Sequence, residues 1–257
     1  MYYFKSHIRI VSAFVIREIA SRYGRSPGGY LWAFLEPIAL ITVMSQLMGV
    51  AFGRMPPVGE SFALFYATGF LAFSSYKAME GYLTSSLSAN QGLLKYPNVA
   101  AIDTVVARFV LQGGTSIVVA LVILGCIVAN LARPVQVDWL KVIEAVTIAW
   151  TIAMGIALAN ITLFFKFPLY QKAYAMVTRP LFLLSGVFLV PSSLPHPLRE
   201  WMLLNPITHI VILYREGFYG GAGNDGLDMS FLLMTAGSLI FVGLFIFTFW
   251  PVSRLRD

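Results

Sequence analysis

The stretch RYGRSPGGYLWAFLEP, Arg22–Pro37, joins a basic, glycine-rich hinge to the start of an apolar run. Its Pro27-Gly28-Gly29 turn interrupts any continuous helix, because proline lacks a backbone donor and glycine leaves the helical conformation readily. Arg22 and Arg25 place the hinge on the positively charged side of a membrane. We therefore expect two elements that meet at an angle where the chain enters a bilayer, an arrangement that usually serves a moving part.

The composition around this stretch is that of a membrane protein. Of the 257 residues, 58% are hydrophobic and only 12% are charged, and the mean hydropathy is +0.76. Soluble domains carry about 25% charged residues, so the chain is predicted to be one polytopic membrane domain, 1–257. The net charge of +6 follows the expected topology and does not indicate nucleic-acid binding. The single cysteine, Cys126, excludes an intrachain disulfide and a cysteine-based metal cage.

Apolar runs of bilayer-spanning length recur along the sequence. Six are predicted to cross the membrane: Leu31–Phe52, Phe62–Leu83, Thr104–Leu131, Val142–Phe165, Ala173–Val190 and Met229–Trp250. Most of the 18 lysines and arginines fall on one side of this arrangement. By the positive-inside rule both termini are then cytoplasmic, and the predicted fold is all-α with six transmembrane helices.

The segment before the hinge, 1–23, is predicted to be an amphipathic helix. An apolar stripe runs along it at helical spacing, formed by Phe4, Ile8, Val11, Val15 and Ile19. Such a helix lies in the membrane interface. Packing of the same helix against another subunit is the alternative.

The last long connection, Pro191–Asp228, contains two apolar clusters separated by Asn205-Pro206. Prolines cut these clusters into helices too short to span a bilayer, and we expect a re-entrant hairpin over 191–220. Irregular backbone at membrane depth is tolerated only inside protein or along a water-filled space. The hairpin therefore indicates a transport pathway.

Enzyme motifs are absent from the sequence. No G-x-x-x-x-G-K-[ST] and no H-E-x-x-H occur, and the three histidines are scattered. We predict no catalytic residue, no metal site and no nucleotide bound by this chain.

Ionisable residues inside a predicted span are functional candidates, because charge at that depth is costly. Lys77 and Glu80 lie three residues apart on one helical face. They serve a transport pathway or form a structural ion pair, and the sequence favours neither. Tyr76 and Tyr82 are too deep for both to belong to an interfacial belt, and aromatic rings stack on sugars. The four residues are predicted to line a channel.

A second set of residues suits an anionic headgroup. Arginine's planar fork matches phosphate oxygens, which makes Arg22 and Arg25 candidates, with simple anchoring to anionic lipid as the alternative. Tyr30, Trp32 and Arg179, which precedes Pro180, complete the predicted headgroup site.

The connection 89–98, ANQGLLKYPN, is predicted to be a short cytoplasmic helix. We expect it to expose Leu93 and Leu94 to a socket in a soluble partner. Packing against the chain's own helix ends is the alternative.

Three stretches together resemble one family. They are RYGRSPGGYLWAFLEP at 22–37, LLKYP at 93–97, and LNPITH at 204–209 followed by YREGFY at 214–219. The chain resembles the membrane subunit of ABC-2 type polysaccharide exporters, most of all the capsular polysaccharide permeases of Gram-negative bacteria.

The resemblance implies a homodimer with two copies of a separate ATPase, which alone binds ATP and magnesium. Segment 1–23 would be the interface helix. Contact with the ATPase would fall to Asn90, Gln91, Leu93, Leu94 and Lys95 in the coupling helix. The external gate helices would carry Trp201, Asn205, Pro206, His209, Arg215 and Tyr219. Periplasmic co-polymerase or adaptor and outer-membrane exporter partners are also implied.

The function expected from this resemblance is export of lipid-linked acidic capsular polysaccharide across the inner membrane. An ABC-2 exporter of O-antigen, teichoic acid or a small amphiphile is the alternative. A stand-alone channel or enzyme is a further alternative.

Overall fold

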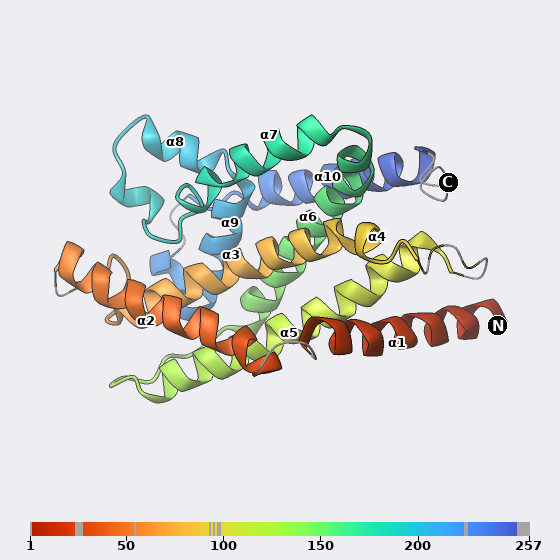
Figure 1. Ribbon diagram of the computed structural model, residues 1–257. Helices are drawn as coiled ribbons and strands as arrows, with labels where there is room; N and C mark the ends of the chain where they lie inside the picture. The colour runs from red at the N-terminus through yellow and green to blue at the C-terminus, as the bar shows by residue number, and fades with distance from the viewer. Residues whose placement is uncertain are drawn as a thin grey trace.

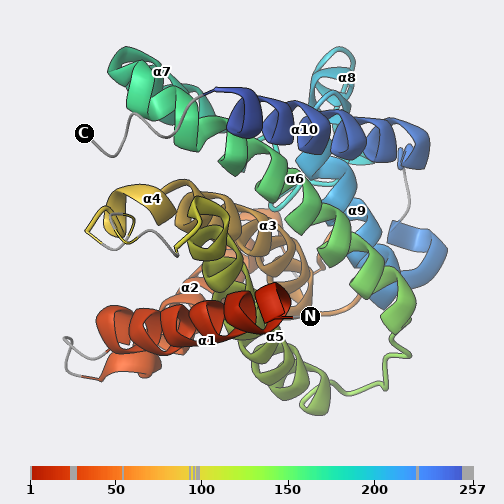
Figure 2. The same cartoon turned by 90° about the vertical axis from the view of Figure 1, so that its right-hand side faces the viewer.

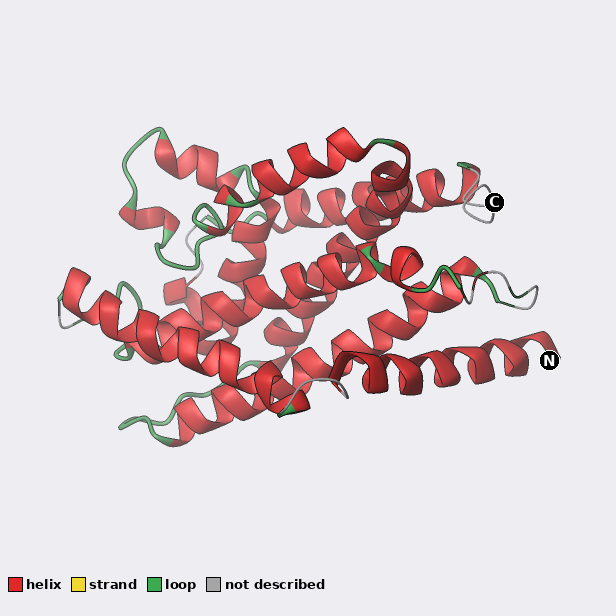
Figure 3. Cartoon of the chain, viewed as in Figure 1, coloured by secondary structure: helices red, strands yellow, loops and turns green. Residues whose placement is uncertain are grey.

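The computed structural model describes residues 2–23, 28–53, 55–92, 94, 96, 99–223 and 226–250. Helices make up most of these residues, and no strand occurs among them (Figure 3). The longer elements are α1 (Tyr2–Tyr23), α2 (Trp32–Phe52), α3 (Phe62–Thr84), α5 (Ala101–Ala129), α6 (Trp139–Lys166), α7 (Pro168–Thr178), α9 (Pro206–Tyr219) and α10 (Met229–Phe249). Short helices are η1 (Gly29–Leu31), α4 (Ser86–Ala89), η3 (Pro180–Phe182), η4 (Pro191–Ser193), α8 (Leu198–Leu203) and η5 (Gly220–Gly223).

Four helices of the described chain are long and apolar enough to cross a membrane. They correspond to Gly29–Val50, which contains α2, and to α5, α6 and α10. The prediction of an all-helical multi-pass membrane protein is thereby confirmed. α1 begins and α10 ends at the same end of the molecule (Figure 1), which is called the terminal end below.

α3 occupies the centre of the bundle, in contact with α2, α5, α6 and α9. Most of its side chains are buried, including Phe65, Tyr66 and Met79. A helix enclosed by protein does not need a lipid-like surface. α3 can therefore carry polar residues along its second half, where the candidate site lies.

Short polar side chains fix where several helices begin. Ser61, Asp138, Asn205 and Asp228 each accept a hydrogen bond from a backbone N–H in the first turn of α3, α6, α9 and α10 respectively. These residue types are preferred at helix N-caps because they satisfy otherwise unpaired donors. Pro206 follows its cap at the first helical position, where its missing N–H has no cost.

The prediction of one continuous span over Ala173–Val190 is wrong. α7 ends at Thr178, η3 follows at Pro180–Phe182, and the chain then turns through Gly186 with a positive φ of 80°. Proline disfavours helical backbone in the residue before it and supplies no N–H, so the helix ends beside Arg179.

α1 is helical, as predicted for 1–23. It packs against α5 (Figures 1 and 2), and Phe14 and Glu18 are its buried residues among those described, while Ile19 of the stripe is exposed. Glu18 faces the bundle, where it pairs with Arg108 of α5.

The two short helices predicted on either side of Asn205-Pro206 are present as α8 and α9. Every residue of α9 from Ile207 to Phe218 is buried. The helix lies among α3, α6 and α10 (Figure 2). This short helix is thus enclosed by protein.

α6 and α10 cross at two glycines. A Cβ on Gly243 would lie 2.1 Å from the carbonyl oxygen of Gly155, and a Cβ on Gly155 would lie 2.5 Å from the backbone of Leu239. Small residues let membrane helices approach this closely.

Candidate functional site

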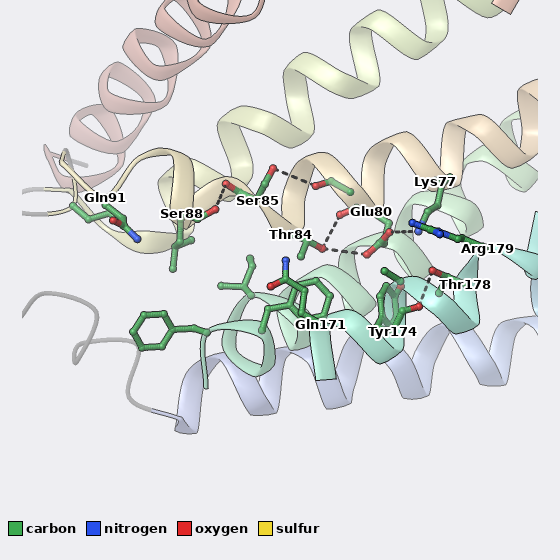
Figure 4. Close-up of a pocket in the computed structure, with 17 residues that line it drawn as sticks. Lys77, Glu80, Thr84, Ser85, Ser88, Gln91, Gln171, Tyr174, Thr178 and Arg179 are labelled. Atoms are coloured by element: carbon green, nitrogen blue, oxygen red, sulfur yellow. Dashed lines mark hydrogen bonds and ion pairs between the residues drawn. The ribbon is translucent and has the colours of Figure 1, made fainter. Parts of the chain in front are cut away.

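A cavity of about 530 Å³ opens near the terminal end, between the second half of α3 with α4 and the junction of α6 with α7 (Figure 4). Its lining mixes charged, polar, aromatic and aliphatic side chains. The lining residues are Lys77, Glu80, Gly81, Thr84, Ser85, Leu87, Ser88, Gln91, Leu94, Ile161, Phe164, Phe165, Gln171, Tyr174, Ala175, Thr178 and Arg179.

Lys77 and Glu80 form an ion pair on this wall. The Nζ atom of Lys77 lies 2.8 Å from Oε2 of Glu80, and the two side chains are 39% and 3% exposed. The other carboxylate oxygen of Glu80 accepts hydrogen bonds from Asn160 of α6 and from Thr84. Glu80 is therefore fixed inside the protein, whereas Lys77 reaches into the cavity, also 5.6 Å from the centre of the Tyr174 ring.

Arg179 reaches the cavity from the end of α7, on the same side as Lys77 (Figure 4). Arg179 was predicted in a headgroup site and Lys77 in a channel, but both line this one cavity. With Glu80, the lining carries two positive charges and one negative charge.

The predicted coupling segment, 89–98, contributes two described residues to the same cavity. Gln91 is exposed and lines it, while Leu94 lines it and is buried. The expected exposure of Leu94 is therefore wrong, because the side chain packs into the chain's own core. Leu93 and Lys95 lie outside the described residues.

Asn90 is buried rather than presented outward, because its side chain joins a polar cluster with α1. Its amide nitrogen donates to Glu18 at 2.9 Å, and its amide oxygen accepts from Arg17 at 3.0 Å. Asn90 thereby ties the coupling segment to α1.

Glu18 and Arg108 form the centre of that cluster, and sequence analysis did not select either. Arg108 of α5 donates Nε–H to Glu18 at 2.9 Å, and both side chains are almost fully buried. Tyr82 donates its hydroxyl to the same carboxylate at 2.9 Å. Glu18 is the only acidic residue of 1–23, and this is the signal that could have indicated a buried partner.

The predicted headgroup residues do not form one site. Arg22 donates to Gln112 of α5 at 2.7 Å and lies 4.3 Å above the Tyr82 ring, so it also holds α1 to the bundle. Tyr30 and Trp32 are exposed near the start of α2. Arg25 lies outside the described residues.

The predicted channel residues divide in the same way. Lys77 and Glu80 line the cavity, whereas Tyr82 faces the α1 cluster. Tyr76 is buried against Phe73 and does not line the cavity.

Most of the predicted gate residues stabilise the packing around α9. Asn205 donates to Leu184 O besides capping the helix at Pro206, and Trp201 is exposed on α8. His209 accepts from Asp228 N–H through Nδ1, so its Nε2 donates to Leu203 O at 2.7 Å. These contacts hold the two ends of the last connection together.

Arg215 is buried in the centre of the molecule and donates to three backbone carbonyls. They belong to Gly186 at 2.6 Å, Val187 at 2.7 Å and Phe65 of α3 at 3.2 Å. Arg215 thus fastens the broken segment after α7 to α3. Tyr219, at the end of α9, is half-buried and lies against Gly59.

The ABC-2 type transporter family model matches residues 10–219, which include α2 to α9 and the whole cavity. The chain belongs to the ABC-2 type transporter family. This ABC-2 chain is 31% identical over 237 residues to the polysialic acid transport protein KpsM of Escherichia coli, covering 91% of this chain and 90% of that protein. It is 29% identical over 244 residues to the capsule polysaccharide export inner-membrane protein CtrC of Neisseria meningitidis, with 92% and 89% covered. Its identity to the protein BexB of Haemophilus influenzae, described in the same words as CtrC, is 27% over 244 residues, with 92% and 89% covered.

Proposed function

We propose that this chain is the transmembrane permease subunit of an ATP-driven exporter of lipid-linked acidic capsular polysaccharide. The observation that carries the proposal is its similarity, over about nine-tenths of its length, to proteins named for polysialic acid transport and capsule polysaccharide export. The transport direction is from cytoplasm to periplasm across a Gram-negative inner membrane.

The chain crosses the membrane six times in this proposal, with both termini in the cytoplasm. α2, α3, α5, α6 and α10 supply five crossings, and the broken segment from α7 to Val190 supplies the remaining one. Support comes from the shared terminal end of α1 and α10 and from the excess of lysine and arginine in the segments predicted to be cytoplasmic. α8 and α9 are the re-entrant external gate helices, and enclosure of α9 by protein is consistent with membrane depth.

The working unit is a homodimer of this chain with two ATPase subunits that hold ATP and magnesium. α2 supports a dimer, because it leaves an apolar groove exposed along Trp32, Leu35, Ala39 and Val43. The polymer passes between the two copies, from the hinge near Tyr30 toward the gate helices. A periplasmic adaptor and an outer-membrane exporter complete the route.

A conformational change in the ATPase is passed to this chain through the end of α4 and the residues that follow it. Gln91 offers an exposed side chain to the ATPase, while Asn90 transmits displacement to Glu18 of α1. Because Gln91 and Leu94 also line the cavity, a shift of this segment changes the cavity.

Complementation of an encapsulated strain that lacks its own export permease tests the function. We expect this chain, supplied with its ATPase, to restore polysaccharide at the cell surface, as measured with anti-capsule antibody. Intracellular accumulation of polymer in spite of stable expression of both subunits would contradict the proposal. Restoration of O-antigen export in the matching deletion strain would favour the alternative cargo.

A further inference from the structure

We propose that the cavity binds an anionic amphiphile, with its phosphate on Lys77 and Arg179 and its hydrocarbon chain on the aromatic wall. The inference rests on the proposed function only in placing the chain in a bilayer as an export permease. It adds a ligand site within one copy of the chain, whereas the polymer route is proposed between two copies.

The polar end of the cavity has unused donors. A lysine ammonium has three N–H donors and an arginine guanidinium has five. Among the residues that the structure describes, Glu80 is the hydrogen-bond acceptor of Lys77, and Arg179 has no acceptor. A phosphate presents several acceptor oxygens and balances the excess positive charge, and bidentate contact with arginine adds geometric specificity.

Glu80 does not neutralise both cations. Its carboxylate accepts from Lys77, Thr84 and Asn160, and it is almost fully buried. Its oxygens are thereby directed to partners on α3 and α6, which leaves Arg179 without a counter-ion in the described chain.

Part of the remaining lining is apolar and suits an acyl chain. Ile161, Phe164 and Phe165 of α6 line the cavity opposite Leu87 and Leu94. A free phosphate or a soluble sugar would leave these walls unoccupied, so the observations favour a lipid.

Native mass spectrometry of the purified full-length protein, with its ATPase, tests the site. The probes are phosphatidylglycerol and phosphatidylcholine of equal chain length, added from mixed micelles. We expect phosphatidylglycerol to be retained about tenfold or more over phosphatidylcholine, because the quaternary ammonium of choline offsets the phosphate charge and is repelled by the two cations, whereas neutral glycerol leaves the phosphate charge uncompensated. Lys77→Gln with Arg179→Gln is expected to abolish this preference. Lys172→Gln is the matched control, because Lys172 is an exposed lysine of α7 that does not line the cavity.

Glu80→Gln gives a test of opposite sign. The amide keeps the contact to Thr84 but removes the charge that holds Lys77, so retention of phosphatidylglycerol is expected to rise. Equal retention of the two lipids by the unaltered protein overturns the site, and this measurement needs no variant to fold. An effect of Lys172→Gln as large as that of the double substitution also overturns it.

Two further comparisons separate the sources of the phosphate. Glycerol phosphate that competes fully with phosphatidylglycerol overturns the amphiphile and leaves a free-anion site. Protein prepared with and without capsule synthesis genes distinguishes a resident phospholipid, retained in both, from a substrate anchor, retained in one; each supports the proposal. Capsule export measured in cells tests the proposed function separately. A protein that exports capsule but shows no lipid preference would contradict only the proposed lipid site.

Discussion

The carboxylate of Glu18 in α1 and the guanidinium of Arg108 in α5 meet in the interior, 90 residues apart in sequence, with Nε and Oε1 2.9 Å apart. Arg108 also donates to Tyr82 O and to the Ser85 hydroxyl, where α3 ends. Because Asn90 donates to the same carboxylate, one ion pair connects α1, α5 and the start of the coupling segment.

We expect Glu18→Ala to destabilise the protein by roughly 3–5 kcal/mol, because it leaves the buried Arg108 without its counter-ion. The measurement is the midpoint of thermal unfolding in detergent. Arg9→Ala, an exposed change on the same helix, is the control and should have little effect. The double variant Glu18→Ala with Arg108→Ala should lose less than the two single losses added together; additive losses would show that the residues do not interact.

The stability of the same contact is predicted to depend on pH. Burial raises the pKa of Glu18, but hydrogen bonds from Arg108, Asn90 and Tyr82 outweigh it and hold the pKa below its ordinary value of 4.5. A carboxyl whose pKa is lower when folded contributes stability above its unfolded pKa and loses it as pH falls through the folded pKa. Acidification from about pH 6 to about pH 3 should therefore lower the unfolding midpoint more in the unaltered protein than in Glu18→Gln. Parallel curves for the two proteins would exclude this contribution.

Gly243→Ala is expected to destabilise the protein by roughly 1–3 kcal/mol, because its methyl group would overlap the carbonyl of Gly155 and force α6 and α10 apart. Gly237→Ala lies on the same helix, where a Cβ meets nothing within 4 Å, and should be neutral or slightly stabilising. Thermal unfolding and the yield of folded protein measure both changes. Similar losses from the two substitutions would argue against a close crossing at Gly243.

Arg215→Lys should lower stability by roughly 2 kcal/mol or more, because a single ammonium cannot reproduce the fork that reaches Gly186, Val187 and Phe65. Release of the segment after α7 should also make it more sensitive to protease under native conditions. Trp201→Ala, on the exposed surface of α8, should leave both readouts unchanged. Unaltered protease resistance in Arg215→Lys would show that the carbonyl contacts do not hold this segment.

Gln91→Cys in a Cys126→Ser background should form a cross-link to the co-expressed ATPase with a short bifunctional reagent. Gln91 is exposed just after α4. Cys126 is the single cysteine of the chain, so its replacement leaves the introduced cysteine as the only one. Val50→Cys in the same background is the control, since Val50 is 87% exposed at the C-terminal end of α2. This position is predicted to lie near the external side of the membrane. A cross-link at Val50 with none at Gln91 would place the ATPase elsewhere.

Local patterns in the sequence predicted much of the fold. Apolar length predicted α2, α5, α6 and α10, and the prolines with the Asn205-Pro206 turn marked α8 and α9. The same approach failed for Ala173–Val190, because hydropathy outweighed the signal of Pro180. It also did not indicate that Phe14 and Glu18 turn one side of α1 toward the bundle, since the apolar stripe consists of other residues.

The sequence by itself determined that the chain is an all-helical membrane protein with charged residues inside the bundle, because hydropathy, capping and proline act over a few neighbouring residues. Tertiary structure alone decided that Lys77 meets Arg179 at one cavity and that Asn90 is tied to Glu18. Such pairings depend on how each helix is rotated and where it crosses its neighbours. Those variables are set by packing of the whole bundle, through contacts such as Gly155 on Gly243, and not by the spacing of residues along one helix.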